Sequence, residues 1–338
     1  NTLLASTITL TLALLTNVGS GINYQLASDY KAVEVPAFID TIINLFPSNL
    51  ANSWVNGEVV PIVIFAVIVA IAYNKIARNQ QKAVLPFKHF IDAGNRVMGE
   101  VVNFVISFTP YAVLALIARA VSKSALSDLI PLLSVLGLAY LLSIIQIFGV
   151  TSVLLKVVGK LNPLNFFKGI WPAGVVAFTS QSSIGTIPVT VRQLTKKLGV
   201  NEDVASFVAS LGANLGMPGC AGIWPVLLAV FAINVLGIDY SIGQYIFLIV
   251  LAVVVSIGTV GVPGTATITA TALFASAGLP IEIIVLLAPI SSIVDMARTA
   301  TNVVGAASAA MLVARSENEL DLAVYNNETI GQPDLEII

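Results

Sequence analysis

The sequence predicts an all-α integral membrane protein with two inverted re-entrant helical hairpins and broken transmembrane helices. One basis is composition: of 338 residues, 57% are hydrophobic and only 10% are charged. A soluble globular chain carries about 25% charged residues, so this chain cannot cover a surface that faces water. The other basis is a near-repeat, "SSIGTIPVT" at 182–190 and "VSIGTVGVPGT" at 255–265, which twice interrupts an apolar segment.

The first half of the chain contains uninterrupted apolar stretches. About 20 apolar residues of helix cross a bilayer core. On this measure 59–77, 92–118 and 129–156 are predicted spans, and residues 1–22 are predicted to be the remainder of another. The polar sequence before residue 59 is predicted to form a loop with short helices.

Three segments of the second half carry no charge but are broken by Gly, Pro and polar residues. The breaks are "TSQSSIGTIPVT" within 169–191, "GMPGC" within 204–238 and "SIGTVGVPGT" within 240–281. Irregular backbone at membrane depth must line a cavity or be buried in protein. Broken helices at matching places in two inverted halves indicate the binding site of a transporter. The alternative, two spanning helices kinked by Gly and Pro, does not account for the repeat.

The distribution of basic residues predicts how the two hairpins enter the membrane. Hairpin 163–197 has Lys168 near its start and Lys196 at its end. Lys and Arg collect on the cytoplasmic side, so both ends of this hairpin are predicted there. Hairpin 240–280 contains no Lys or Arg, and its ends are predicted outside. Two hairpins that enter from opposite faces would bring their tips together near the midplane.

Asp295 and Arg298 are the candidate charged groups of a binding site. They are three residues apart and therefore share one face of a helix. Ionisable residues inside the membrane are costly and usually functional. Asp295 suits an ammonium group and Arg298 a carboxylate, and Thr299 and Asn302 continue the same face. The alternative is an ion pair that only holds helices together.

The hairpin tips would add hydrogen-bonding groups for a second carboxylate. These are backbone amides and the hydroxyls of Ser182, Ser183, Thr186 and Thr259. An α-amino acid presents an ammonium and a carboxylate together, so the sequence favours an amino-acid substrate. The chain has one His and one Cys, and nothing in it predicts an enzyme, a metal site, a cofactor or a nucleic-acid partner.

Three motifs, "TSQSSIGTIPVT", "SIGTVGVPGT" and "DMARTATNVVG", resemble the first hairpin, second hairpin and last helix of one transporter family. This family comprises the glutamate transporter homologues, or dicarboxylate/amino acid:cation symporters. The resemblance runs from about residue 1 to 315. It implies an elevator-type homotrimer in a lipid bilayer, specifically a multi-pass protein of the bacterial inner (plasma) membrane.

The resemblance also implies a domain organisation. Residues 1–160 would be mainly scaffold and trimerisation helices, with 1–22 the rest of a third spanning helix and the family's first two helices absent. Residues 161–315 would be the core of a mobile transport domain, and 316–338 an acidic cytoplasmic tail. The core would comprise hairpin 163–197, broken helix 200–236, hairpin 240–280 and last helix 282–314.

Roles for single residues follow from the resemblance. Asp295 would bind the substrate amino group, Arg298 its distal carboxylate, and Asn302 its backbone. Ser183 and Val262 would contact the substrate from the two hairpin tips. The other candidate substrate-binding residues are Ser182, Gly264, Met217, Cys220 and Thr299.

The chain departs from the family where sodium would bind. Sodium-coupled members carry Asn-Met-Asp-Gly-Thr in the broken helix, whereas this chain has Gly-Met-Pro-Gly-Cys at 216–220. They also carry an aspartate at the position of Ala306. Because hard cations need several oxygen ligands, these losses disfavour sodium coupling. The candidate coupling-ion residues are Asp295, Ser256 and Thr259, with Asp295 as the proton carrier.

Residues 179–225 resemble most closely the bacterial L-cystine symporters, a branch thought to use protons. The predicted function is therefore sodium-independent, proton-coupled import of L-cystine by an elevator mechanism. A proton- or sodium-coupled glutamate/aspartate symporter is the alternative, because Pro263 and Thr265 in the second hairpin are nearer the glutamate type. A channel-like conductance is a more distant alternative.

Overall fold

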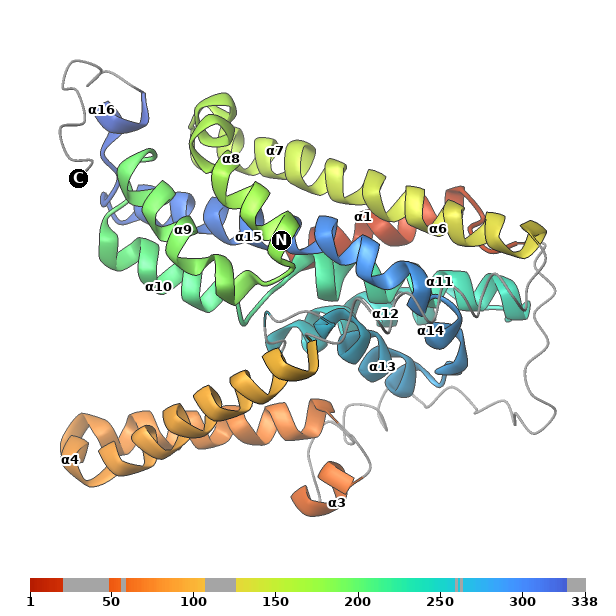
Figure 1. Ribbon diagram of the computed structural model, residues 1–338, viewed down its shortest axis with the longest axis horizontal. Coiled ribbons are helices and arrows are strands. Elements are labelled where there is room, and N and C mark those ends of the chain that lie inside the picture. Colours follow the sequence, from red (N-terminus) through yellow and green to blue (C-terminus); the bar gives the residue numbers. More distant parts are fainter. Residues whose placement is uncertain (21–48, 56–58, 107–125, 259–260, 262–263, 327–338) are drawn as a thin grey trace. The chain divides into compact units, whose positions relative to one another are not determined.

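The computed structural model describes the chain except for residues 21–48, 56–58, 107–125, 259–260, 262–263 and 327–338. The described residues form helices and no β-strand; their one isolated bridge joins Val200 and Leu320 (Figure 1). The prediction of an all-α chain is therefore confirmed for this part of the protein.

The described residues form the following helices. In chain order they are α1 (Thr2–Leu15), α3 (Leu50–Val55), α4 (Val59–Ile106), α6 (Leu126–Ile144), the π-helix η1 (Ile145–Val150), α7 (Thr151–Val157), α8 (Pro163–Ser180), α9 (Ser183–Lys196), α10 (Glu202–Gly212), the π-helix η2 (Pro218–Ile223), α11 (Trp224–Leu236), α12 (Ile242–Val255), the 3-10 helix η3 (Ser256–Gly258), α13 (Thr265–Ala277), α14 (Glu282–Leu286), α15 (Ala288–Ser316) and α16 (Leu322–Tyr325).

Contacts divide the chain into two units. The first comprises Asn1–Tyr30, Pro131–Ala275 and Leu279–Ile338, and the second comprises Lys31–Ile130 with Ser276–Gly278. The division at residue 160 into scaffold and transport domains stays a prediction. Within the first unit, α1 lies against η2 and α12, and α7 lies against α15.

The predicted first hairpin, 163–197, corresponds to α8 and α9, which pack against each other. Gln181 ends α8 in a left-handed conformation, with φ 55°. The Ser182 hydroxyl then accepts a hydrogen bond from the Gly185 amide at 3.0 Å and caps α9. A polar tip of two residues therefore reverses the chain between two helices.

The predicted second hairpin, 240–280, contains α12 and α13. Ser241 and Gln244 form a capping box at the start of α12. The 14 residues of α12 extend about 21 Å at 1.5 Å per residue, less than the ~30 Å thickness of a bilayer core. Each arm of this hairpin is therefore shorter than a full span.

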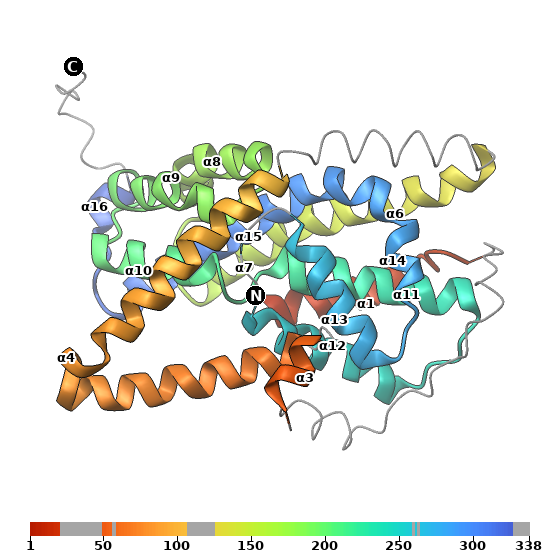
Figure 2. The ribbon, with the colours of Figure 1, turned by 60° about the horizontal axis from the view of Figure 1, so that its bottom comes forward.

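The predicted broken helix, 200–236, is interrupted between α10 and η2. Pro218 stands at the first position of η2, where no helical partner for its missing N–H is needed. The last helix, α15, packs against α8, α9, α10 and η2, so it runs through the centre of the first unit (Figure 2). The buried core at one end of α15 includes Phe166, Leu194 and Met311.

Two helical stretches of the described residues are long and apolar enough to cross a membrane. They are Leu132–Val157, which is continuous through α6, η1 and α7, and Pro218–Leu236, through η2 and α11. Among the described residues there are also three shorter apolar helices: Thr2–Leu15, Ile242–Val255 and Thr265–Ala277. The predicted span 129–156 thus agrees with the first stretch.

The second unit differs from the sequence expectation. The element α4 includes the predicted span 59–77, the basic stretch and the start of span 92–118, but it consists of two helical arms separated at Gln80. The helix bends at Gln80 (φ −140°, ψ 54°), and Pro86 follows within its second arm. Figure 1 shows the two arms leaving this bend, and the Tyr73 and Phe87 rings meet across it with centroids 6.3 Å apart. The remainder of the span 92–118 lies outside the described residues.

Part of the predicted acidic tail, 316–338, is folded against the first hairpin. The Asn201 amide donates to the Glu319 carbonyl at 3.0 Å, and the Asp321 amide donates to the Gly199 carbonyl at 2.8 Å. Tyr325 is buried and donates its hydroxyl to the Asn162 carbonyl at 2.6 Å. Backbone hydrogen bonds and one buried ring therefore fasten α16 to the base of the first hairpin.

Candidate functional site

One face of α15 gathers the four predicted polar residues Asp295, Arg298, Thr299 and Asn302. All four are buried, with at most 3% of each exposed. The Asp295 Oδ1 and Arg298 Nη2 atoms form an ion pair at 3.0 Å. The helical spacing expected from the sequence therefore produces a buried charged pair with no net charge.

The second hairpin reaches Asp295 through its backbone. The Gly264 amide donates to Asp295 Oδ2 at 3.3 Å. Gly264 has φ +84°, a conformation in which glycine avoids steric strain. Both carboxylate oxygens of Asp295 therefore have a donor, one from its own helix and one from the hairpin tip.

Arg298 is only partly satisfied. Its Nη2 group also donates to the Ser291 carbonyl at 2.9 Å, and its Cζ lies 4.6 Å from the centre of the Trp224 ring. The Nε and Nη1 groups have no hydrogen-bond partner among the described residues. The guanidinium therefore keeps donors for a further acceptor.

Asn302 ties α15 to the start of η2. Its Oδ1 atom accepts from the amides of Gly219 at 2.8 Å and Cys220 at 3.4 Å, and its Nδ2 group donates to Cys220 Sγ at 3.1 Å. These amides are free because the first turn of a helix lacks intrahelical acceptors. A Cβ on Gly219 would overlap the Arg298 carbonyl, so this approach requires glycine.

The two hairpin tips meet at Gly261. Its carbonyl accepts from the Ile184 amide at 3.1 Å and from the Ser182 hydroxyl at 3.4 Å. A Cβ on Gly261 would overlap both Ala213 and Ser183. The structure therefore brings the first hairpin, the second hairpin and the end of α10 together, while Thr259 and Val262 lie outside the described residues.

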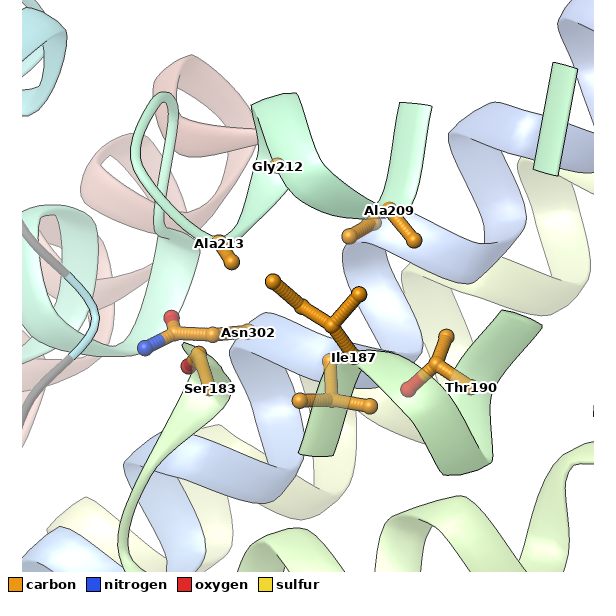
Figure 3. Close-up of a pocket in the computed structure, with 9 residues that line it drawn as sticks. Ser183, Ile187, Thr190, Ala209, Gly212, Ala213 and Asn302 are labelled. Carbon is orange, nitrogen blue, oxygen red and sulfur yellow. The ribbon is translucent and has the colours of Figure 1, made fainter. Parts of the chain in front are cut away.

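A small cavity lies beside Asn302, between α9, α10 and α15 (Figure 3). Its volume is about 10 Å³, roughly the space of one water molecule. Its lining comprises Ser183, Ile187, Thr190, Ala209, Gly212, Ala213, Asn302, Val303 and Ala306. None of these side chains is a carboxylate, although hard cations favour several oxygen ligands that often include one.

The remaining predicted residues lie nearby in the first unit. Met217 is fully buried and precedes η2. Ser256 is buried, and its hydroxyl donates to the Val253 carbonyl at 2.6 Å. Its backbone carbonyl accepts from the Gly216 amide at 3.0 Å. Within the described ranges, no group of three or more His, Cys, Asp or Glu residues could hold a metal ion.

Three residues of the site were not predicted from the sequence. Trp224 stacks on Arg298, Ser291 binds the Arg298 guanidinium, and the Thr269 hydroxyl donates to the Cys220 carbonyl at 2.6 Å. Ser291 lies seven residues, or about two helical turns, before Arg298. This spacing places both on one face of the helix, so the sequence could have indicated Ser291. Trp224 and Thr269 contact the site through tertiary packing and carry no local signal.

A buried charged pair among broken helices, in a chain this apolar, is the arrangement of a membrane transporter. The family model described as sodium:dicarboxylate symporter family matches residues 1–316, so the chain belongs to this family. The resemblance inferred from the hairpin and last-helix motifs is thereby confirmed, and the chain is a membrane protein of a family of transporters rather than enzymes.

Particular relatives lie within that family. The chain is 32% identical over 303 residues to the L-cystine uptake protein TcyP of Bacillus anthracis, covering 88% of this chain and 65% of the relative. TcyP of Bacillus licheniformis is 31% identical over 309 residues, covering 90% and 66%. An uncharacterized symporter of Haemophilus influenzae is 34% identical over 294 residues, covering 87% and 66%. The chain thus spans about 65% of the length of the curated relatives that it matches first.

Proposed function

We propose that the chain is the main part of a secondary active amino-acid transporter that imports L-cystine across the bacterial plasma membrane. The observation that supports this most is the buried pair of Asp295 and Arg298, which lies where the second hairpin tip and η2 reach α15. The name of the TcyP relatives supports L-cystine as the substrate. The elevator mechanism and the homotrimer are proposed from the family resemblance.

The donors and acceptors of the site match the groups of an amino acid. Asp295 provides the negative charge for the substrate ammonium, and Arg298 provides free donors for a distal carboxylate. Asn302 and the tip of the first hairpin would contact the α-carboxylate. In the present structure Asp295 is held by Arg298 and by Gly264, so the substrate ammonium would share or replace these donors.

Coupling is proposed to be independent of sodium and driven by protons. Ala306 contributes a methyl group to the lining of the small cavity beside Asn302. Gly212 packs so closely against this methyl group that a Cβ on residue 212 would overlap the methyl group. No carboxylate of the described residues faces that cavity. Asp295 is the proposed proton carrier because it is the acidic residue of the buried site.

Uptake measurements test the coupling. Radiolabelled L-cystine uptake into proteoliposomes should persist when sodium is replaced by choline, and an inward proton gradient should drive it. Collapse of the gradient by a protonophore is the matched control. A steep, saturable requirement for sodium would contradict this proposal and move the assignment toward the sodium-coupled members.

Calorimetric titration tests the substrate. The purified protein should bind L-cystine, and L-glutamate, L-aspartate and succinate serve as competitors of different charge. Tight L-aspartate binding without L-cystine binding would favour the acidic amino-acid alternative, which Thr265 at the second hairpin suggests. Binding of succinate would show that Asp295 does not recognise an ammonium group. Saturable exchange of substrate distinguishes a transporter from a channel-like conductance.

A further inference from the structure

Three hydrogen-bond donors of the site are buried and have no acceptor among the residues that the structure describes. They are the Trp224 Nε1 group and the Nε and Nη1 groups of Arg298. Each of these two side chains is only 1% exposed. A buried indole N–H normally finds a partner, and a buried donor without one is a cost that requires an explanation.

The unpaired donors belong to two side chains that stack on each other. The Arg298 Cζ atom lies 4.6 Å from the centre of the Trp224 ring, within the range of a cation–π contact. Asp295 and Ser291 both bind Nη2, and Nε and Nη1 stay unpaired among the described residues. The three donors therefore belong to two side chains in contact, one from the start of α11 and one from the middle of α15.

Neither Trp224 nor Arg298 can provide the missing hydrogen-bond acceptor for the other. Indole and guanidinium groups donate and do not accept, so they cannot pair with each other. The unpaired hydroxyls of Thr2 and Thr9 differ in this respect, because a hydroxyl can rotate and also accepts. An acceptor supplied from outside the described chain would satisfy all three donors.

The charge balance indicates which acceptor this is. Asp295 neutralises Arg298 at 3.0 Å. When a substrate ammonium takes up the charge of Asp295, the positive charge of Arg298 is left for a second anionic group. Three donors around one positive charge suit a carboxylate.

We propose that Trp224 is a specificity-determining residue, whose indole N–H binds the distal carboxylate of the substrate together with the free N–H groups of Arg298. This inference rests on the proposed amino-acid transport function and deepens it. The site would select amino acids with a distal carboxylate, because a ligand without one leaves the buried donors unpaired. The indole face would at the same time hold the guanidinium in place.

The variant Trp224→Phe tests the N–H separately from the ring. It keeps an aromatic face beneath Arg298 and removes the donor together with part of the ring. L-cystine is compared with the mixed disulfide of L-cysteine and cysteamine, which lacks only the distal carboxylate. We expect the variant to lose roughly tenfold more affinity for L-cystine than for the mixed disulfide, as for loss of a hydrogen bond to a charged group.

Controls separate recognition from folding. Trp171→Phe alters a tryptophan of α8 that is 61% exposed, and it should change neither affinity. The thermal unfolding temperature of Trp224→Phe should fall by the amount that a smaller ring at a buried position costs, and this loss of packing should lower the affinities for both ligands alike rather than selectively. Equal loss of affinity for both ligands, or no loss for either, would overturn the assignment to Trp224.

The same titrations distinguish failure of the proposed transport function from failure of the inference about Trp224. A wild-type protein that binds L-glutamate instead of L-cystine is tested with L-glutamate and L-2-aminobutyrate, which again differ in the distal carboxylate. A wild-type protein that binds no amino acid overturns both the proposed function and this inference. A wild-type protein that binds L-cystine but shows no selective effect at Trp224 overturns the inference alone.

Discussion

At the scale of single residues, Asp295 is the acidic group of the site and has a partner on each carboxylate oxygen. Its two oxygens accept from Arg298 and from the Gly264 amide of the second hairpin. An ionised carboxylate only accepts, so it can serve both of these donors and also a substrate ammonium. Replacing it with an amide would remove the charge and leave Arg298 buried without its partner.

Asp295→Asn is therefore expected to abolish amino-acid binding. Breaking a buried charged contact typically costs about 2–5 kcal/mol, which is on the order of 30-fold or more in affinity. Calorimetric titration of the variant measures this loss. Asp203→Asn, at an exposed position of α10, is the matched control and should bind as the wild type does. Unchanged affinity in Asp295→Asn would contradict the role of Asp295.

Arg298→Ala should act selectively. Amino acids with a distal carboxylate lose their charged partner, whereas small neutral ones such as L-serine do not depend on it. The ratio of the two affinities in a competition assay reports this difference. Arg315→Ala, which alters an exposed arginine of the same helix, should leave the ratio unchanged. An equal loss for both ligand types would indicate that Arg298 holds the fold instead.

Gly219→Ala should destabilise the protein, because its Cβ would overlap the Arg298 carbonyl. Overpacking of a tight contact costs about 1–3 kcal/mol. Gly137→Ala is the matched control, since no atom lies within 4 Å of its added Cβ. That control removes a glycine from an exposed helical position and is expected to be neutral or to stabilise by up to about 1 kcal/mol. Thermal unfolding in detergent compares the two variants with the wild type.

At the scale of elements, the contact of the two hairpins depends on short polar tips. The first tip contributes Ser182 and the Ile184 amide, and both bind the Gly261 carbonyl of the second. Because Gly261 has no side chain, its backbone can lie directly against Ser183 of the first tip and Ala213 at the end of α10. In the proposed membrane arrangement, arms shorter than a full span, such as the 14 residues of α12, would allow these tips to lie at depth.

A cysteine placed at Ser183 should report substrate binding at the hairpin tips. In a Cys220→Ala background, maleimide labelling of Ser183→Cys is expected to fall when L-cystathionine is added, because the ligand would cover this tip. This thioether analogue of L-cystine is used because it cannot exchange disulfides with the introduced thiol. Ser316→Cys, at the exposed end of α15, should be labelled equally with and without substrate. If the labelling of Ser183→Cys, like that of Ser316→Cys, does not change when L-cystathionine is added, this would count against a site at the tips.

Tyr325 connects the end of the described chain to the base of the first hairpin. Burial raises the pKa of its phenol to about 12 from an ordinary 10. The folded protein therefore favours the neutral phenol, and its contribution to stability is complete below pH 10 and lost as pH rises toward 12. Tyr325→Phe should lower stability by about 0.5–1.5 kcal/mol at neutral pH, since the hydrogen bond to the Asn162 carbonyl is lost. Unfolding temperatures between pH 8 and 11 should fall less steeply for this variant than for the wild type.

At the scale of the whole molecule, the second unit exposes large apolar side chains along α4. Phe65 is 40% exposed, Ile71 63% and Phe90 73%. Apolar surfaces of this kind require lipid or another protein surface. Since the family resemblance implies a homotrimer, we expect light scattering of the protein in detergent to give three times the mass of one chain. A protomer-sized particle would contradict this assembly.

The sequence by itself determined the helical class, the family and the identity of the charged pair. Each of these rests on local features: apolar composition, the position of Gly and Pro, and the helical spacing of Asp295, Arg298 and Asn302. The breaks in hairpins 163–197 and 240–280 were predictable for the same reason. The bend in α4 was not, because the basic stretch around Gln80 resembles a loop while its residues can also form helix.

Only the tertiary structure decided which of these segments meet. Asn302 binds the amide of Gly219, 83 positions away, and Ser182 binds the Gly261 carbonyl, 79 positions away. Trp224 reaches Arg298 and Tyr325 reaches Asn162 in the same long-range manner. The physical reason is that helix periodicity and capping depend on neighbours within about four residues, whereas the pairing of helices depends on how complete apolar faces and unpaired backbone groups pack together.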